Sequence, residues 1–308
     1  MNEQPLPAAA PAGTAADGSW RPRVAIAMRS YNDIDVIRGT LDMVRRQTYA
    51  DVALWNFDSS SRDGTLEVIR EHNDPARIEQ NDPAGYNPGK VLNHAVATVG
   101  GDVVVFLNSD ATPETEDWLE RLIAPLADPA VGAVYGRQTA RPDCRSLFRK
   151  DTERAFGDGR EAARWVHFFS MANAAARRDV LERFPFETRV QYSEDIEWSW
   201  RLRKAGLEVR YVPDAAATHS HNYTLKQSYK RQYGEGKAEA WIFRDGEVGT
   251  SFLRYVLLPA GMELLRDLRW SVHERSWDAA LHSLPLRLIQ KWGRWQGLKA
   301  GRRDYGLA

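Results

Sequence analysis

The strongest constraint on the fold is a regular alternation of short apolar runs and amphipathic stretches in the first third of the chain. The apolar run Val24–Met28 is followed by Ile34–Gln47, whose apolar residues recur at helical spacing. The alternation continues with expected strands at Val52–Phe57 and Asp102–Leu107 and expected helices at Thr65–His72 and Lys90–Val99. This order predicts an α/β fold with a mostly parallel sheet covered by helices on both faces.

The pattern changes in the second half of the chain. We expect further helices at Glu116–Leu126, Asp179–Phe184 and Glu194–Ala205, and strands at Val131–Tyr135 and Glu208–Val212. The polar stretch Arg141–Arg164 reads as a long loop over the site. From Thr224 onward the pattern is helical with no strand signal. The predicted organisation is a disordered leader over 1–20, an α/β domain over 21–223 and a helical C-terminal region over 224–308.

Composition excludes several classes of protein. The 308 residues carry 42 Lys and Arg against 42 Asp and Glu, so the bulk charge gives no reason to expect a nucleic acid partner. A single cysteine, Cys144, cannot form an internal disulfide, which favours a cytoplasmic setting. The Ala/Pro-rich start lacks the basic and apolar blocks of a secretory signal. The sequence has no uncharged apolar stretch of about 18 residues, so it predicts no membrane span.

Three polar clusters follow the expected strands at the point where each strand ends. They are Arg29–Asp33, Asp58–Asp63 and Asn108–Asp110. Ligands on sheets of this kind bind outside the carboxyl ends of the strands, so these clusters mark the expected site. For the first cluster alone, an ordinary loop is the favoured interpretation. For Asp58, a ligand contact and a turn or helix cap are about equally supported.

The third cluster, in the run Phe106–Pro113, is harder to explain as structure alone. Acidic side chains near a core lose hydration and need a partner, and a divalent cation with oxygen ligands is one such partner. Such a cation neutralises charge on a departing diphosphate. The structural alternative is a turn in which Asp110 caps the following helix.

Two further groups come later in the chain. Glu194 and Asp195 begin an expected helix, where they would either cap the helix or supply a general base that takes a proton from an acceptor hydroxyl. His219 and His221 follow the last expected strand, and histidine is a common metal ligand. Residues spaced by two point to opposite sides of an extended chain, so we expect one of the two histidines to face the site.

Together and in this order, the clusters resemble the inverting glycosyltransferases of family 2, which have the GT-A fold, a Rossmann-like α/β fold. The resemblance covers about Arg23–Tyr233. It rests on the following motifs: Ser30-Tyr-Asn32, Asp58-Ser-x-Ser-x-Asp-Gly-Thr65, Gly89-Lys-x-Leu-Asn93, Gly101-Asp102, Phe106-Leu-Asn-Ser-Asp110, Glu194-Asp195 with Trp198 and Arg201-Leu-x-x-x-Gly206, and His219.

The resemblance implies a role for each matching residue. The nucleotide-sugar donor would be bound by Ser30, Tyr31, Asp58, Lys90, Asn93, Asn108 and Ser109. Asp58 would contact the base, and Lys90 and Asn93 the ribose or phosphates. Asp110 would hold a divalent metal, Mg²⁺ or Mn²⁺, with His219 as a further metal or diphosphate contact. Asp195 would be the catalytic base, with Glu194 beside it.

One residue departs from the family pattern. The first acidic position of the Asp-x-Asp motif is Asn108, which brings no charge. The Asn-x-Asp form resembles rhamnosyltransferases of the family, and it favours dTDP-rhamnose as donor, with UDP-sugars next. The predicted activity is transfer to a hydroxyl of a glycan or lipid-linked acceptor in cell-surface polysaccharide synthesis. Arg29 stands where the family often has a small residue or Thr, and it would face the diphosphate.

Alternatives remain for both parts of the chain. A Rossmann-type cofactor enzyme should have a Gly-x-Gly-x-x-Gly turn after the first strand, which the run Arg29–Asn32 lacks. A catalytically silent nucleotide-sugar-binding module stays open. The Arg- and Trp-rich tail suits either peripheral contact with the inner face of a membrane or a helical region whose Trp residues pack on the catalytic core or on a second copy in a homodimer. Packing is the favoured interpretation.

Overall fold

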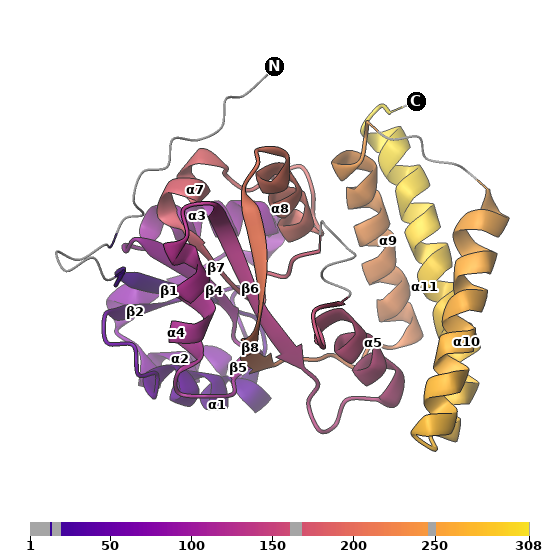
Figure 1. The fold of residues 1–308 in the computed structure, drawn as a ribbon, viewed down its shortest axis with the longest axis horizontal. Helices are drawn as coiled ribbons and strands as arrows, with labels where there is room; N and C mark the ends of the chain where they lie inside the picture. Colours follow the sequence, from indigo (N-terminus) through magenta and orange to yellow (C-terminus); the bar gives the residue numbers. More distant parts are fainter. Residues whose placement is uncertain (1–12, 14–19, 161–167, 246–250, 308) are drawn as a thin grey trace. The chain divides into compact units, whose positions relative to one another are not determined.

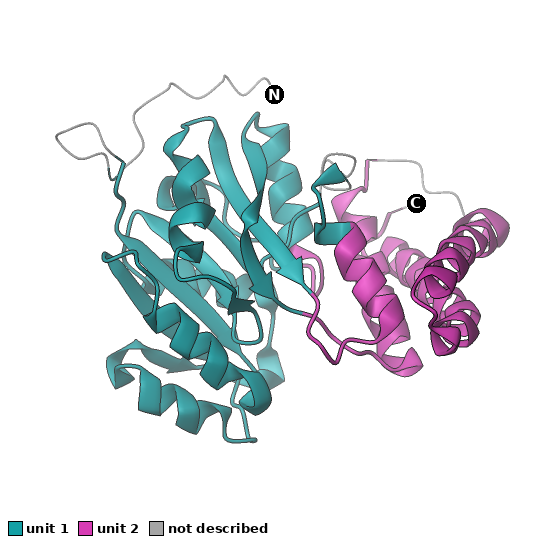
Figure 2. Cartoon of the chain, turned by 60° about the horizontal axis from the view of Figure 1, so that its bottom comes forward, with its two compact units in different colours: residues 1–139, 155–188, 195–219 teal, residues 140–154, 189–194, 220–308 magenta. Residues whose placement is uncertain are grey.

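The computed structural model describes residues 13, 20–160, 168–245 and 251–307. Most of the predicted leader therefore lies outside the described residues. The described chain divides into two compact units (Figure 2). The α/β unit comprises residues 20–139, 155–160, 168–188 and 195–219, and the helical unit comprises residues 140–154, 189–194, 220–245 and 251–307. The helical unit thus takes two short segments from within the sequence of the α/β unit.

A mixed sheet of eight strands forms the centre of the α/β unit (Figure 1). In chain order the strands are β1 (Val24–Ser30), β2 (Val52–Asp58), β3 (Ile78–Gln80), β4 (Val103–Asn108), β5 (Thr112–Pro113), β6 (Val131–Thr139), β7 (Asn173–Arg177) and β8 (Glu208–Thr218). Their order in the sheet is β3-β2-β1-β4-β7-β6-β8-β5. The first four strands of this order, β3, β2, β1 and β4, are parallel to one another, as the strand–helix alternation predicts. Strand β7 then pairs antiparallel with both of its neighbours.

Helices cover both faces of this sheet. They are α1 (Ile34–Arg45), α2 (Thr65–His72), α3 (Pro88–Thr98), α4 (Trp118–Ile123), α7 (Arg178–Arg183) and α8 (Glu194–Lys204). Alternate residues of β1 serve two separate cores. Ile26 and Met28 pack with Leu41 of α1, whereas Ala25 packs with Leu92 of α3. Strand β1 is therefore buried on both faces, which is why it reads as a continuous apolar run.

The prediction of a long loop over Arg141–Arg164 is wrong, because a helix, α5 (Ser146–Phe156), occupies its centre. Few of its residues are apolar, so its pattern resembles a loop. In the structure it buries Leu147 and the charged Lys150. Buried ion pairs take the place that leucines hold in an ordinary amphipathic helix. Residues 161–164, at the end of the predicted loop, lie outside the described residues.

The C-terminal region is helical, as predicted, and among the described residues from 224 onward there is no strand. Its helices are α9 (Leu225–Ile242), a π-helical turn (Leu253–Leu257), α10 (Leu258–His273) and α11 (Trp277–Asp304). Most of its tryptophans pack within the helical unit itself. The rings of Trp292 and Tyr229 lie 5.3 Å apart, as do those of Trp295 and Phe252.

Helices α9 and α11 approach each other closely because glycines line their contact. A Cβ atom on Gly297 would lie 1.9 Å from the carbonyl oxygen of Tyr233, and one on Gly236 would lie 2.0 Å from that of Arg294. Any larger side chain would force the two backbones apart. Gly293, Gly297 and Gly301 recur at a spacing of four, so they share one face of α11.

Candidate active site

The strand register brings the three predicted polar clusters to one edge of the sheet. Ser30 at the end of β1 lies opposite Asp58 at the end of β2, and Arg29 lies opposite Asn108 at the end of β4. Backbone hydrogen bonds continue past the strand ends: Ser59 N–H donates to the carbonyl of Ser30 over 2.9 Å. The clusters therefore start from neighbouring strand ends.

Asp58 is fully buried and organises the loop that follows β2. Its carboxylate accepts hydrogen bonds from the hydroxyls of Ser30 and Ser61, both over 2.7 Å, and from the Ser61 N–H over 2.8 Å. Ser60, which precedes Ser61 in this loop, adopts a positive φ of 59°. The structure thus joins two predicted donor-binding residues, Ser30 and Asp58. Tyr31, a third predicted donor-binding residue, follows Ser30 in the sequence, and 57% of it is exposed.

Asn108 is held by Arg29, whose guanidinium donates to the side-chain oxygen of Asn108 over 3.1 Å. An aspartate at this position would form an ion pair with that guanidinium. The neutral amide orients Arg29 without cancelling its charge. The departure from the acidic motif therefore places an arginine–asparagine pair at the strand edge, and an arginine there suits a diphosphate ligand.

Asp33 is the last residue of the first polar cluster, and the sequence suggested no role for it. Its carboxylate accepts hydrogen bonds from the hydroxyl of Ser109, which is fully buried, and from the Tyr31 N–H over 3.1 Å. Burial raises the pKa of Asp33, and the nearby charge of Asp110 adds to that effect, whereas both hydrogen bonds oppose it. Asp33 precedes helix α1, so in the sequence it resembles an ordinary helix cap.

Asp110 and His219 face each other across the edge. The Nε2 atom of His219 lies 3.5 Å from Oδ1 of Asp110, and the two side chains are each 12% exposed. Strand β8 ends at Thr218, which pairs with Thr139 of β6 and Thr112 of β5, so the sheet fixes the position of His219. The backbone N–H of His219 donates to the carbonyl of Thr139 over 2.8 Å.

A second residue, Gln138, sets the tautomer of His219. The side-chain nitrogen of Gln138 donates to Ser170 Oγ over 2.8 Å, which leaves its oxygen to face His219 Nδ1 at 2.7 Å. Nδ1 must therefore carry the proton, and in neutral His219 the lone pair of Nε2 points to the side of Asp110. Two acceptors that face each other form a suitable place for a cation.

Carboxylate and imidazole are ligands that suit Mg²⁺, Mn²⁺ and related divalent ions. Asp110 and His219 thus fit the predicted metal site in both chemistry and geometry. His221, the second histidine of the predicted pair, follows two residues later at the start of the helical unit.

Asp195 lies in the first turn of α8, where backbone donors hold it. Its Oδ1 accepts from the Ile196 N–H over 2.8 Å and its Oδ2 from the Met171 N–H over 3.4 Å. Ala172, next to Met171, accepts a hydrogen bond from the Asn108 N–H over 3.1 Å. Asp195 is thereby tied to the end of β4. Glu194 is the first residue of the same helix and is half-buried.

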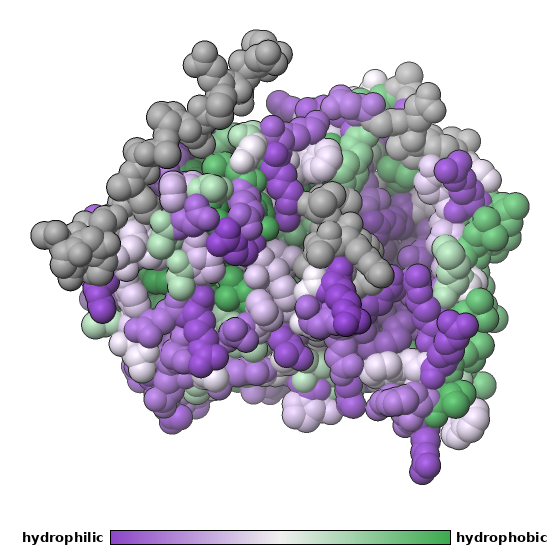
Figure 3. Space-filling model, viewed as in Figure 1, coloured by the Kyte–Doolittle hydropathy of each residue, from purple (hydrophilic) through white to green (hydrophobic). Residues whose placement is uncertain are grey.

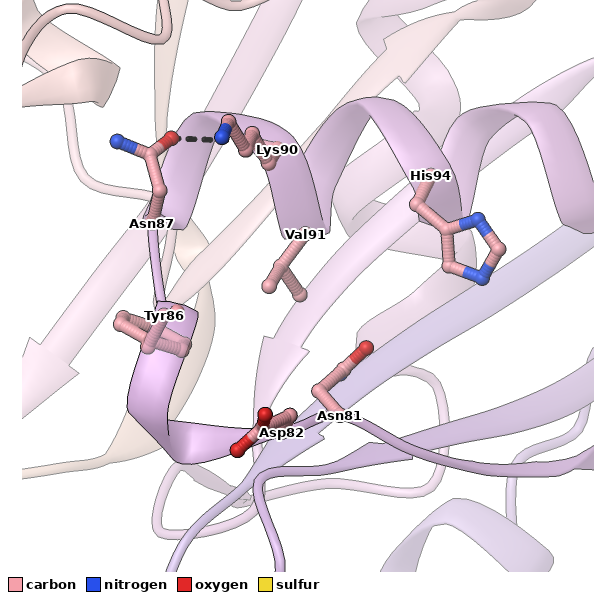
Figure 4. A pocket seen from close by; sticks show the side chains of 8 residues that line it. Asn81, Asp82, Tyr86, Asn87, Lys90, Val91 and His94 are labelled. Carbon is pink, nitrogen blue, oxygen red and sulfur yellow. Dashed lines mark hydrogen bonds between the residues drawn. The ribbon is translucent and has the colours of Figure 1, made fainter.

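A cavity of about 210 Å³ lies beside β3 and the start of α3 (Figure 4). Its lining includes Asn81, Asp82, Tyr86, Lys90 and His94. These hydrogen-bonding, charged and aromatic groups suit a polar ligand with a flat ring. Lys90, a predicted donor-binding residue, is exposed here, and its backbone N–H caps α3 by donating to the Asn87 side chain over 2.9 Å.

Asn93 belongs to the same helix but has a visible structural use. Its side-chain nitrogen donates to the carbonyl of Phe186 over 2.9 Å, and its oxygen accepts from the Phe186 N–H over 2.7 Å. Both ends of the amide thus hold the backbone before α8. Contact with the donor stays a prediction for this residue.

The fold is that of the GT-A glycosyltransferases. The structure of a mannosyltransferase from Pyrobaculum calidifontis, determined with GDP-mannose and Mn²⁺, matches 94% of this chain and 89% of its own with a TM-score of 0.63 and 21% identity. Glucosyl-3-phosphoglycerate synthase from Mycobacterium tuberculosis, determined with Mn²⁺ and UDP, matches 71% of this chain and 78% of its own with a TM-score of 0.54 and 18% identity.

The sequence comparisons are more specific. Residues 25–184 match the model of glycosyl transferase family 2. The chain is 33% identical to the O-antigen chain rhamnosyltransferase WbaN of Salmonella anatum, over 85% of this chain and 84% of that protein. It is 29% identical to the O-antigen chain rhamnosyltransferase RfbN of Salmonella typhimurium, over 92% of this chain and 91% of that protein. The chain belongs to glycosyl transferase family 2, which confirms the resemblance inferred from its motifs, and it is a glycosyltransferase.

Proposed function

We propose that this enzyme transfers rhamnose from a nucleoside-diphosphate donor, dTDP-rhamnose, to a hydroxyl of a glycan or lipid-linked acceptor in O-antigen synthesis. The two Salmonella relatives, which this chain matches over most of its length, support both the sugar and the pathway. The observation that carries the reaction is the pairing of Asp110 and His219 at the strand edge that also holds Asp195. UDP-sugars are the next donor class to test.

Asp110 and His219 would hold Mg²⁺ or Mn²⁺. When bound, such an ion supplies positive charge that neutralises the diphosphate of the departing nucleotide. Arg29, whose guanidinium contacts Asn108 at the same strand edge, would add a positive charge toward the diphosphate. Lys90 would contact the ribose or phosphates from the start of α3.

Asp195 would act as the general base. The acceptor hydroxyl loses its proton to this carboxylate while its oxygen forms a bond to the anomeric carbon. The bond from that carbon to the diphosphate oxygen breaks on the opposite face, so the configuration inverts and the nucleoside diphosphate leaves. The backbone N–H donors of Met171 and Ile196 fix the direction of the carboxylate without neutralising it.

A donor screen tests this proposal. Purified protein is incubated with dTDP-rhamnose, UDP-glucose and GDP-mannose, each with Mn²⁺, with Mg²⁺ and with a chelator, and release of the nucleoside diphosphate is measured. We expect release from dTDP-rhamnose with metal only, and a loss of about 10²–10³-fold in Asp110→Asn. Tight donor binding with no release under any condition, even with added lipid-linked acceptor, would instead identify a silent binding module. Metal-independent release would exclude the Asp110 site.

A further inference from the structure

Helix α10 is turned so that its acids are buried and its leucines are exposed. Its two carboxylates, Glu263 and Asp267, point into the helical unit, and Asp267 is fully buried. Asp267 pairs there with Lys150 and Arg287, and Glu263 with Arg154. The interior of this unit is therefore stabilised by ion pairs on the side where an ordinary helix would place apolar residues.

The opposite face of α10 is apolar and exposed. Its outward residues recur at helical spacing and are Leu258, Met262, Leu265, Leu268 and Val272, all between 40% and 67% exposed. We call these five residues the apolar face. Figure 3 shows hydrophobic surface over α10 at the right-hand edge of the view. Single exposed leucines are common on proteins, but a continuous helical stripe marks an interaction surface.

Further exposed apolar side chains lie on neighbouring elements of the helical unit. Leu253 and Leu257 of the π-helical turn are exposed directly before α10. At the start of α11, Trp277 is 70% exposed and Leu281 is 80% exposed, and Leu284 follows at helical spacing. Helix α11 packs against α10 within the same unit.

Arginines outnumber acids on the surface around the apolar face, where Glu274, just after α10, is exposed as well. Arg254, Arg266 and Arg269 are exposed on or beside α10. From Leu225 to Asp304 the sequence has 15 Lys and Arg against 9 Asp and Glu, whereas the whole chain is neutral. The excess of six positive charges thus lies in the stretch that forms α9, α10 and α11, the helices of the unit that carries the apolar face.

We propose that the apolar face of α10 is a docking surface for an anionic phospholipid membrane. Leucine, methionine and valine side chains would enter the boundary between headgroups and acyl chains, while the arginines would contact anionic headgroups. Charge complementarity favours this occupant over a second copy of the chain. A symmetric dimer through the same face would bring the arginines of two copies together. The proposal does not depend on which sugar the enzyme transfers.

Vesicle flotation of the full chain tests the proposal. We expect the protein to float with vesicles of phosphatidylcholine mixed with phosphatidylglycerol, and to bind phosphatidylcholine alone more weakly. The double variant Leu258→Gln, Leu265→Gln should bind at least about tenfold more weakly, because two apolar side chains no longer enter the bilayer. The control Leu225→Gln changes a leucine that is also exposed but begins α9, and it should float like the unchanged protein.

Several results would overturn the proposal. They are failure of the unchanged protein to float with anionic vesicles, equal flotation of the double variant, and a dimer of the unchanged protein in solution that the double variant converts to monomer. Circular dichroism shows whether the variants stay folded. Should the double variant unfold, Arg254→Gln with Arg269→Gln provides a second test, in which binding to anionic vesicles should fall while binding to neutral ones does not. Release of nucleoside diphosphate, measured without vesicles, reports separately on the proposed reaction.

Discussion

In the α/β unit, Asp58 lies fully buried against the hydroxyls of Ser30 and Ser61, whereas in the helical unit Asp267 lies equally buried against Lys150 and Arg287. Hydroxyl and amide donors fix the direction of a carboxylate and leave its charge in place. Ammonium and guanidinium partners cancel that charge. A buried carboxylate held by neutral donors thus stays able to attract a ligand, and one held by cations serves the fold.

The same distinction separates two acids within helix α8. Glu197 is buried and forms an ion pair with Arg201, its neighbour one turn later, over 2.8 Å. Asp195 is held by the backbone donors of Met171 and Ile196. Glu197 thus stabilises the helix, whereas Asp195 in its first turn is the acid that we propose as the general base.

The largest expected effect comes from replacing Asp195 itself. Asp195→Asn should lower kcat by about 10²–10⁴-fold, because the amide cannot take the acceptor proton. Donor affinity, measured by calorimetry, should change little, since the amide oxygen can still accept from the Ile196 N–H and only the longer contact to the Met171 N–H is lost.

Glu194→Gln is the matched control in the same helical turn, and it should keep most of the activity. A strong loss in Glu194→Gln with activity retained in Asp195→Asn would move the base to Glu194. Comparable thermal unfolding of both variants would show that the loss is chemical.

The next effect concerns stability. Asp267→Asn should lower the free energy of unfolding by about 3–5 kcal/mol, because it leaves the buried charges of Lys150 and Arg287 only partly compensated. Glu274→Gln, which changes an exposed acid just after α10, should stay within about 0.5 kcal/mol of the unchanged protein. Denaturant unfolding measures both.

The contribution of Asp267 should also depend on pH. Burial alone would raise the pKa of Asp267, but its bonds to Arg287 and Lys150 hold that pKa below the ordinary value of 3.8. A lowered carboxyl pKa stabilises the fold above the ordinary value, and the contribution is lost as the pH falls through the folded value. The difference in unfolding free energy between the unchanged protein and Asp267→Asn should therefore shrink below pH 3.8. A constant difference across that range would show that Asp267 contributes by packing rather than by charge.

The sequence was informative where burial leaves a local pattern. Strands β1, β2 and β4 are predicted correctly because parallel strands covered on both faces read as apolar runs. The polar residues after them are also found, since they stand at fixed offsets from the strand ends. Strand β7 was not predicted, because its Asn-Ala-Ala-Ala-Arg sequence favours no strand pattern.

Other features depend on residues far apart in the chain. Helix α5 buries a lysine whose partner, Asp267, lies 117 residues later, so no local pattern distinguishes it from a loop. The close approach of α9 and α11 had a usable signal in the glycines at spacing of four on α11, which we did not exploit. The role of Gln138 depends on a partner 81 residues away and left no signal.

The smallest expected effect concerns Gln138, whose side-chain oxygen faces Nδ1 of His219. Gln138→Leu removes the acceptor that holds the Nδ1 proton of His219, so the lone pair of Nε2 is no longer directed to the side of Asp110. Loss of such a supporting hydrogen bond costs about 10–100-fold in metal affinity, which Mn²⁺ titration by calorimetry measures. Gln138→Glu is the matched control, because a carboxylate still accepts the Nδ1 proton and should retain tight binding. Equal Mn²⁺ affinity in the leucine and glutamate variants would mean that the metal does not depend on the His219 tautomer. Weak binding in Gln138→Leu alone would show that the α/β unit orients His219 through a neutral partner, in the way that Ser30 and Ser61 orient the carboxylate of Asp58.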